Sequence, residues 1–331
     1  MINLFNRFAK HRNILTQKNM KKIYTILYLC VVAFCINIFM IVFKSKAATN
    51  TPSPVAYTSD ENNPAAIVSD VFMPTKFDLA GEAVPLQRLD VQESFKKELI
   101  VNTYLHSHTI QILKNSPRIF AIIEPILKKN GIPDDFKYLA VIESNLNPLA
   151  VSPAGAVGVW QFMKGTAQEL GLEVNTEIDE RYNIEKSTEA AAKYLQKAYE
   201  RFGSWTMAAA SYNAGNSMIS RQMEIQKENN YYDLLLGEET GRYVFRILAL
   251  KQIINHPELY NFNVQTIYPS EKVKKIKVTG AVKSWADFAH EQGISYKILK
   301  RFNPWLRKTE LRNPHHKTYE ISIPAKTELY K

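Results

Sequence analysis

Residues 138–163 read YLAVIESNLNPLAVSPAGAVGVWQFM, and this stretch decides how the chain folds. It begins as an apolar run typical of a buried helix and carries one carboxylate, Glu143, near the end of that run. We expect the helix to stop within Asn145–Pro148, because a proline disfavours the helical conformation of the residue before it. Small residues at 152–158 predict a loop, and Trp160 is expected to begin a second helix.

Glu143 is the first candidate for a catalytic group. A buried helix removes water from a carboxyl and raises its pKa, which suits a general acid that works near neutral pH. The alternative is a solvated carboxylate at a helix end, which is the ordinary situation of a glutamate. The other motifs of the chain weigh against this alternative.

Four motifs follow one another in the chain. Glu143–Ser144 ends the first helix, and Gly158–Gln161 reads GVWQ. Further on, Ser211–Gly215 reads SYNAG and Glu239–Val244 reads ETGRYV. In this order they resemble the motifs of the lytic transglycosylases with a goose-type-lysozyme-like fold, the SLT family. The departures from the usual family residues are Trp160, Ser211 and Gly241.

The resemblance implies a mainly α-helical, lysozyme-like domain in which Glu143 is the only catalytic acid and base. Its substrate would be peptidoglycan, cleaved between N-acetylmuramic acid and N-acetylglucosamine with closure of a 1,6-anhydro ring. It implies no metal and no other cofactor. By residue match, the groups that would orient the acid or line the sugar subsites are Ser144, Ser152, Gln161, Met163, Tyr212, Asn213 and Tyr243.

Three other functions fit parts of the sequence. A muramidase would hydrolyse the same bond with water and would need Asp179, Glu180 or Glu239 across the cleft from Glu143. A peptidoglycan-binding scaffold without catalysis is disfavoured because Glu143 and its neighbouring motifs are all present. A membrane-tethered helical adaptor leaves the four motifs unexplained.

The N-terminal region predicts export. Residues 1–46 hold eight Lys and Arg and no Asp or Glu, and Ile23–Phe43 is uncharged and long enough to cross a bilayer. The basic residues before this span predict that the rest of the chain is carried to the periplasmic side. The span is either a retained membrane anchor or a signal peptide that starts at Met20 and is cut near Ala47–Ala48. The expected location is therefore the cell envelope.

The sequence divides into four regions. Residues 1–46 form the basic stub and membrane or signal segment, 47–90 a linker, 91–268 the lysozyme-like domain and 271–331 a C-terminal module. Both cysteines lie within residues 1–46, so the exported part contains no disulfide. Within the domain, helices are expected from Val91 to Ser116, Pro117 to Lys129, Thr188 to Phe202, Trp205 to Tyr212 and Glu238 to His256.

The C-terminal module alternates between strand and helix patterns. Strands are expected at 272–278 and 319–324, and helices at 283–289 and 296–301. This order, with Asn303–Pro304 after the second helix, resembles a LysM module, which implies binding to glycans that contain N-acetylglucosamine. Residues 271–331 hold 14 Lys and Arg against 6 Asp and Glu. Because no zinc-ligand spacing or nucleic-acid-binding motif accompanies this basic excess, nucleic acid is not an expected partner.

Overall fold

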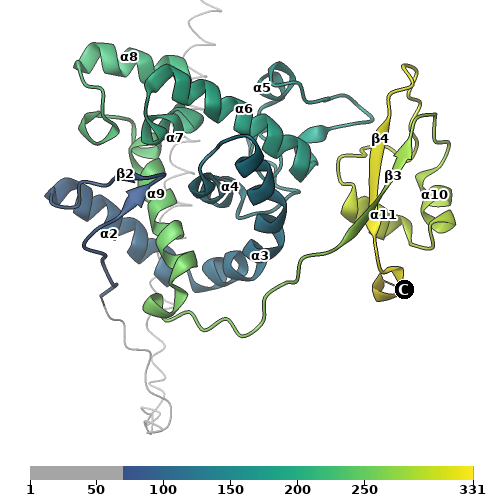
Figure 1. Cartoon of the computed structure of the whole chain (residues 1–331), viewed down its shortest axis with the longest axis horizontal. Coiled ribbons are helices and arrows are strands. Elements are labelled where there is room, and N and C mark those ends of the chain that lie inside the picture. Colours follow the sequence, from purple (N-terminus) through teal and green to yellow (C-terminus); the bar gives the residue numbers. More distant parts are fainter. Residues whose placement is uncertain (1–69, 331) are drawn as a thin grey trace, which may run out of the picture. The chain divides into compact units, whose positions relative to one another are not determined.

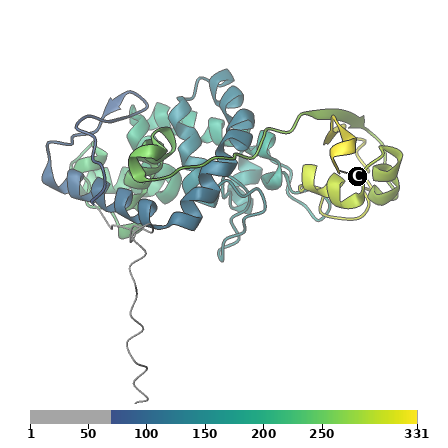
Figure 2. The ribbon, with the colours of Figure 1, turned by 90° about the horizontal axis from the view of Figure 1, so that it is seen from below.

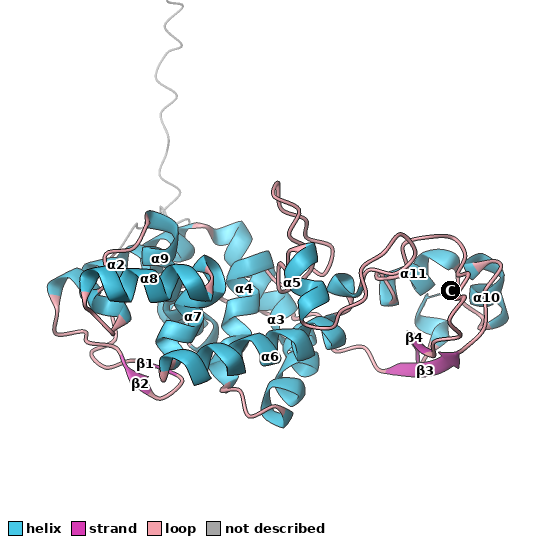
Figure 3. Ribbon diagram, turned by 90° about the horizontal axis from the view of Figure 1, so that it is seen from above, coloured by secondary structure: helices cyan, strands magenta, loops and turns pink. Residues whose placement is uncertain are grey.

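Helices build the chain from Leu89 to Asn255, and strands occur only as two short antiparallel pairs in the described part, residues 70–330 of a computed structural model (Figures 1 and 3). The described residues belong to one compact unit. The elements are β1 (Asp78–Leu79), β2 (Glu82–Ala83), α2 (Leu89–Tyr104), α3 (His106–Lys129), α4 (Lys137–Ser144), α5 (Lys164–Glu169), α6 (Ile184–Phe202), α7 (Trp205–Ala214), α8 (Asn216–Gln226), α9 (Glu238–Asn255), β3 (Val273–Val278), α10 (Trp285–Glu291), α11 (Tyr296–Phe302) and β4 (Tyr319–Pro324).

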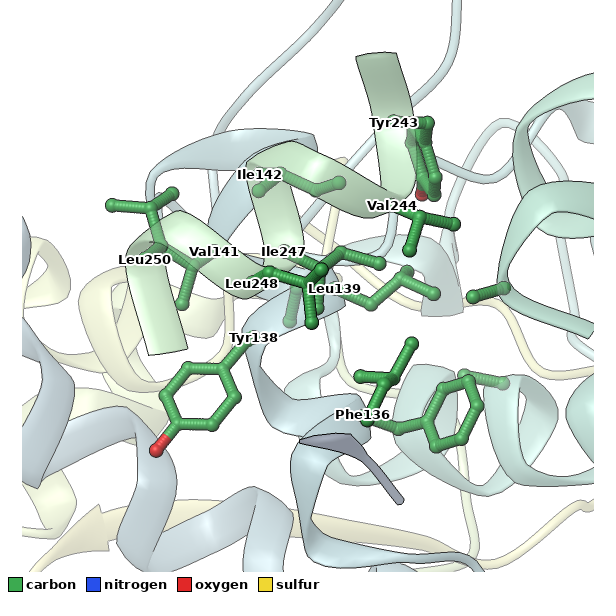
Figure 4. Close-up of a cluster of buried hydrophobic side chains, with 14 of the residues drawn as sticks. Phe136, Tyr138, Leu139, Val141, Ile142, Tyr243, Val244, Ile247, Leu248 and Leu250 are labelled. Atoms are coloured by element: carbon green, nitrogen blue, oxygen red, sulfur yellow. The ribbon is translucent and has the colours of Figure 1, made fainter. Parts of the chain in front are cut away.

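The short helix α4 lies at the centre of the helical part (Figure 1). Leu139, Ala140 and Val141 are completely buried, and apolar side chains point to every side of the helix, as a fully enclosed helix requires. Figure 4 shows Leu139 and Val141 of α4 beside Ile247 and Leu248 of α9, the helix against which α4 packs. The expected buried helix before Glu143 is therefore confirmed.

The end of α4 also follows the prediction. Asn145 adopts the left-handed conformation with a φ of 54°, and its N–H donates to the carbonyl of Val141. Asparagine tolerates this conformation better than most residues, so it ends the helix at low cost. Leu146 follows with a φ of 59° and turns the chain toward the loop.

The prediction for the first two helices was wrong about where they separate. The break lies at Leu105, and Pro117 lies inside α3 rather than at its start. A proline inside a helix leaves the carbonyl four residues earlier without its donor. Here the hydroxyl of Ser116 donates to that carbonyl, on Leu113, at 3.2 Å. Burial of the apolar face of α3 then keeps the helix continuous.

Two other helix starts were also misplaced. Trp160 lies in a turn, and α5 begins only at Lys164, because Gln161 adopts a φ of 49° that a helix cannot accommodate. Helix α6 begins at Ile184, where the side chain of Asn183 accepts the N–H of Lys186 at 3.1 Å. Asparagine is a strong N-cap, so α6 begins four residues before the predicted start at Thr188. Helix α8 was not predicted.

The C-terminal module has the predicted order of strand, helix, helix and strand. Strands β3 and β4 pair antiparallel from Val273 opposite Pro324 to Val278 opposite Tyr319. Residues 261–272 reach the module as a connection without regular structure (Figure 2). Asn303 is completely buried, donates to the carbonyls of Leu299 and Ser322, and thereby fixes the end of α11 against β4.

Part of the predicted linker is packed into the helical domain. Leu79, Val84 and Leu86 are buried in its core, and the carboxylate of Glu82 accepts the N–H of Thr206 at the start of α7. The predicted membrane span and both cysteines lie outside the described residues. Within residues 70–330, no helix combines the length and the apolar character that crossing a bilayer requires.

Candidate active site

The carboxyl group of Glu143 occupies the last turn of α4, where the buried helix meets the loop. Its side chain is half-buried, and the hydroxyl of Tyr243 on α9 donates a hydrogen bond to its Oε1. Burial raises the pKa of Glu143 to about 7, opposed by the Tyr243 hydrogen bond and by the positive charge of Arg246. The negative charge of Glu239 adds to the rise. This carboxyl can therefore donate or accept a proton near neutral pH.

Two tyrosines stand close to this carboxyl. Tyr243 is buried, and Tyr212 is half-buried with its hydroxyl donating to the carbonyl of Trp160 at 2.8 Å. Burial, followed by the charge of Glu143, raises the pKa of both hydroxyls well above its usual value. Both remain protonated donors at neutral pH, and Tyr243 can stabilise a carboxylate at Glu143.

Ser144 connects α4 to the loop that follows. Its hydroxyl donates to the carbonyl of Val159 at 2.9 Å and to that of Ala140 at 3.2 Å. Because Ser144 is buried and both contacts are to the backbone, it holds the loop beside the residue that carries the acid.

The other two polar loop residues predicted for the site, Ser152 and Gln161, bond to the backbone of the loop that contains them. The hydroxyl of Ser152 accepts the N–H of Ala156 at 3.0 Å, which is the contact of a turn residue. The side-chain amide of Gln161 donates to the carbonyl of Gly158 at 2.8 Å. Both side chains therefore shape the loop in this structure.

The remaining predicted residues lie just before α5 and on α7. Met163 precedes α5 with 45% of its surface exposed, so it is available for contact. Asn213 accepts a hydrogen bond from the hydroxyl of Thr240 at 2.8 Å and donates to Glu239 at 3.3 Å. Asn213 thus joins the end of α7 to the start of α9, the helix that carries Tyr243.

The three carboxylates considered for a muramidase differ in their surroundings. Asp179 forms a buried ion pair with Arg181, and Glu180 accepts the backbone N–H of Glu173 at 2.8 Å. Both carboxylates therefore bond to partners within residues 173–181. Glu239 alone of the three appears among the charges that act on Glu143.

Two groups near the site were missed by sequence reasoning. Arg246 donates to the carbonyl of Ile142 at 3.3 Å, and its charge reaches Glu143. It lies three residues after Tyr243 on α9, and this spacing on one helix face was a signal that could have identified it. The second is Arg181, whose buried guanidinium donates to the loop carbonyls of Gly155 and Phe162.

A cavity of about 420 Å³ adjoins the segment after the acid-bearing helix. It is bordered by Asn147–Pro148, by Arg118 of α3 and by Trp305 and Arg301 of the C-terminal module. Glu143 is not among its lining residues. No group of three or more His, Cys, Asp or Glu side chains within residues 70–330 is arranged to hold a metal ion.

Comparison with known proteins identifies both parts of the chain. Residues 120–235 match the family model of the transglycosylase SLT domain. Residues 274–327 match that of the soluble lytic transglycosylase C-terminal LysM-like domain. These matches confirm the resemblance predicted from the motifs, with a mainly helical, lysozyme-like fold followed by a small module that contains strands.

The chain is also similar to individual proteins. Membrane-bound lytic murein transglycosylase D of Escherichia coli (strain K12) is 29% identical over 226 residues, which are 67% of this chain and 49% of that protein. Peptidoglycan transglycosylase gp16 of Escherichia phage T7 is 33% identical over 140 residues, covering 41% of this chain and 10% of its own. The solved 70 kDa soluble lytic transglycosylase of Escherichia coli is 24% identical, with a TM-score of 0.36 and coverage of 44% and 27%. The chain spans about half the length of the first relative.

Proposed function

We propose that this chain, which carries a transglycosylase SLT domain followed by a LysM-like domain, is a peptidoglycan lytic transglycosylase. It would cleave the β-1,4 bond between N-acetylmuramic acid and N-acetylglucosamine and leave 1,6-anhydro-N-acetylmuramic acid ends. The observation that carries this proposal is the half-buried Glu143, whose pKa is about 7 and whose Oε1 is held by Tyr243.

Glu143 acts first as the acid. Because its pKa lies near neutrality, protonated Glu143 is populated at neutral pH, so a proton is available for the glycosidic oxygen. The proton moves to that oxygen, the bond from the anomeric carbon to it breaks, and the N-acetylglucosamine side leaves as an alcohol. The N-acetyl group of the muramoyl sugar meets the positive charge that develops on its ring. Tyr243 stabilises the carboxylate that remains on Glu143.

Glu143 then acts as the base. Its carboxylate takes the proton of the 6-hydroxyl of the muramoyl sugar, and the freed oxygen forms a bond to the anomeric carbon. The 1,6-anhydro ring closes, and Glu143 regains its proton, so one residue completes the cycle. A pKa near neutrality suits this double role, because neither protonation state is strongly favoured.

The other site residues take supporting roles in this proposal. Tyr212 and Met163 contact the sugars, and Asn213 holds the start of α9 beside them. The residues that keep the loop in shape around the acid are Ser144, Ser152 and Gln161.

The envelope location and the region boundaries are part of the same proposal. Residues 91–268 form the transglycosylase domain, and residues 271–331 form the glycan-binding module. Residues 47–90 are the linker between the membrane or signal segment, residues 1–46, and the transglycosylase domain. The charge pattern of the N-terminal region supports a periplasmic position for the enzyme, held at the membrane or released by cleavage.

Mass spectrometry of the products tests the chemistry. The full-length protein and its Glu143→Gln variant are incubated with purified peptidoglycan, and the released fragments are weighed. Fragments with 1,6-anhydro ends from the wild type alone are the expected result. Reducing ends, heavier by one water, would identify a muramidase, and Glu239→Gln would then test whether Glu239 is its second carboxylate.

The scaffold function has its own outcome in this experiment. If neither protein releases fragments while both are folded and bind sedimented peptidoglycan, the chain is a glycan-binding scaffold. Equal amounts of fragments from both proteins would remove Glu143 from the mechanism.

A further inference from the structure

A hairpin formed by residues 173–182 pairs with the C-terminal module. The N–H of Asp179 donates to the carbonyl of Trp305 at 2.9 Å, and Ile178 forms an antiparallel bridge with Leu306. The hairpin lies between α5 and α6 in the sequence, so it belongs to the helical part of the chain. Backbone pairing therefore joins the helical part to the module.

Buried apolar side chains reinforce this pairing. Ile178 and Leu306 are 1% and 0% exposed, and both belong to the same cluster as Trp285 in the core of the module. The ion pair between Arg312 and Glu177 at the same junction has an arginine side chain 74% exposed, so it contributes little. The junction is held mainly by its backbone and its apolar contacts.

Arg181 extends the connection from the hairpin to the active-site loop. Its Nε and Nη2 bond both oxygens of Asp179 at 2.9 and 2.8 Å, and Nη1 donates to the carbonyls of Gly155 and Phe162 at 3.1 and 3.2 Å. Arg181 and Asp179 are 8% and 7% exposed. A buried guanidinium with all these contacts holds its partners in one geometry.

The loop held by Arg181 is the one that borders the acid. The carbonyl of Val159 accepts the hydroxyl of Ser144, next to Glu143, and the carbonyl of Trp160 accepts the hydroxyl of Tyr212. A continuous series of contacts therefore runs from Leu306 through the hairpin and Arg181 to the residues around Glu143.

We propose that the C-terminal module is part of the framework of the active site and that Arg181 is the positioning residue through which it acts. The inference rests on the proposed function, because it concerns the same acid. The module would then do more than bind glycan: its Trp305–Leu306 segment would fix the hairpin, and Arg181 would fix the loop of residues 155–162.

Arg181→Lys in the full-length protein tests the positioning role. Lysine keeps the charge beside Asp179 but cannot make both carbonyl contacts. We expect kcat on purified glycan strands to fall at least tenfold with KM changed less than threefold. Amide hydrogen exchange of Gly158 and Phe162 should become at least tenfold faster. Arg88→Lys is the matched control, because Arg88 pairs with Asp90 and Asp233 and lies outside this series of contacts.

Ile178→Ala tests the contribution of the module. It weakens the junction from the hairpin side and leaves the residues of the module unchanged. Faster exchange at Gly158 and Phe162 together with a lower kcat would support the proposal. If both variants fold and the exchange of these amides and kcat stay within twofold of the wild type, the proposal is wrong.

The exchange measurement separates this inference from the proposed function. Loss of amide protection in both variants, with no 1,6-anhydro products from any form of the protein, would reject the proposed chemistry and keep the structural coupling. Normal amide protection in both variants, together with 1,6-anhydro products from the wild type, would reject the structural coupling and keep the proposed chemistry.

Discussion

The hydroxyl of Tyr243 donates a hydrogen bond to Oε1 of Glu143, although 100 positions of sequence separate the two residues. Burial raises the pKa of Glu143, and this hydrogen bond is the largest influence that lowers it. The two effects together leave the carboxyl able to exchange a proton near pH 7. The packing of α4 against α9 therefore sets the chemistry of the acid.

Replacing Tyr243 with phenylalanine should raise the pKa of Glu143 above about 7, because the carboxylate loses its donor. The carboxylate formed after proton donation is then less stable, and we expect kcat to fall roughly 10- to 100-fold. A pH–rate profile measures both effects: the decline on the alkaline side should move to higher pH while the maximum falls.

Tyr138→Phe is the matched control for this change. Tyr138 lies on the same helix as Glu143 and is as buried as Tyr243, but its hydroxyl contacts Asn255. The profile of this variant should keep the wild-type midpoint. A Tyr243→Phe enzyme with an unshifted profile and full kcat would show that the hydrogen bond has no catalytic role.

The activity of the wild type should decline as the pH rises through about 7. The first step needs protonated Glu143, whose population falls tenfold per pH unit above its pKa. We expect kcat/KM to follow this decline with a slope of −1 on logarithmic axes. Constant activity up to pH 9 would contradict a role for Glu143 as the acid.

Glu143→Gln should stabilise the protein at alkaline pH. The folded-state pKa of about 7 lies above the ordinary glutamate pKa of 4.5, so the folded state binds more protons than the unfolded state between these limits. Wild-type stability therefore falls as the pH rises from 4.5 to 7, by up to roughly 3 kcal/mol. Glutamine cannot ionise, so the free energy of unfolding of the Glu143→Gln variant lacks this decrease.

Thermal unfolding at pH 5 and pH 8 measures the difference. The Tm of Glu143→Gln should exceed that of the wild type by several degrees at pH 8 and by much less at pH 5. The control is Glu238→Gln, since the side chain of Glu238 is 82% exposed. The same gain at both pH values would mean that the ionisation of Glu143 is not its cause.

The sequence was most informative where one local pattern determines the structure. The unbroken apolar run of 138–142 could only be a buried element, and Asn145 supplied a residue that tolerates the left-handed end of α4. The strand β4 likewise followed from a local pattern, and Asn303–Pro304 was expected after the second helix of the module. The position of Glu143 at the end of a buried helix was therefore predictable from the sequence.

The errors arose where a side-chain hydrogen bond, local or distant, decides the backbone conformation. Ser116 supplies the hydrogen bond that lets α3 continue through Pro117, and no helix-propensity rule includes that contact. Arg181 was overlooked because its partners in the loop precede it by 19 and 26 residues. The apolar residues around Trp160 resembled the start of a helix, but Gln161 has a φ of 49°, so the helix begins only at Lys164.

Gly158 provides the sharpest test of the loop geometry. Its φ is +80°, and a Cβ at this position would lie 2.0 Å from the carbonyl oxygen of Arg181. Gly155, in the same loop, has a φ of +85° with no atom within 4 Å of its Cβ position. Both glycines have a positive φ, but only Gly158 lacks space for a Cβ atom.

Gly155→Ala should therefore cost about 1–2 kcal/mol in the free energy of unfolding, which is the backbone strain alone. Gly158→Ala must also displace the backbone at Arg181, and we expect a loss of more than about 3 kcal/mol. Chemical denaturation of both variants measures these losses. Because the displaced backbone belongs to Arg181, Gly158→Ala should also reduce kcat, and a fully active variant with equal losses at both glycines would contradict the close approach of the two segments.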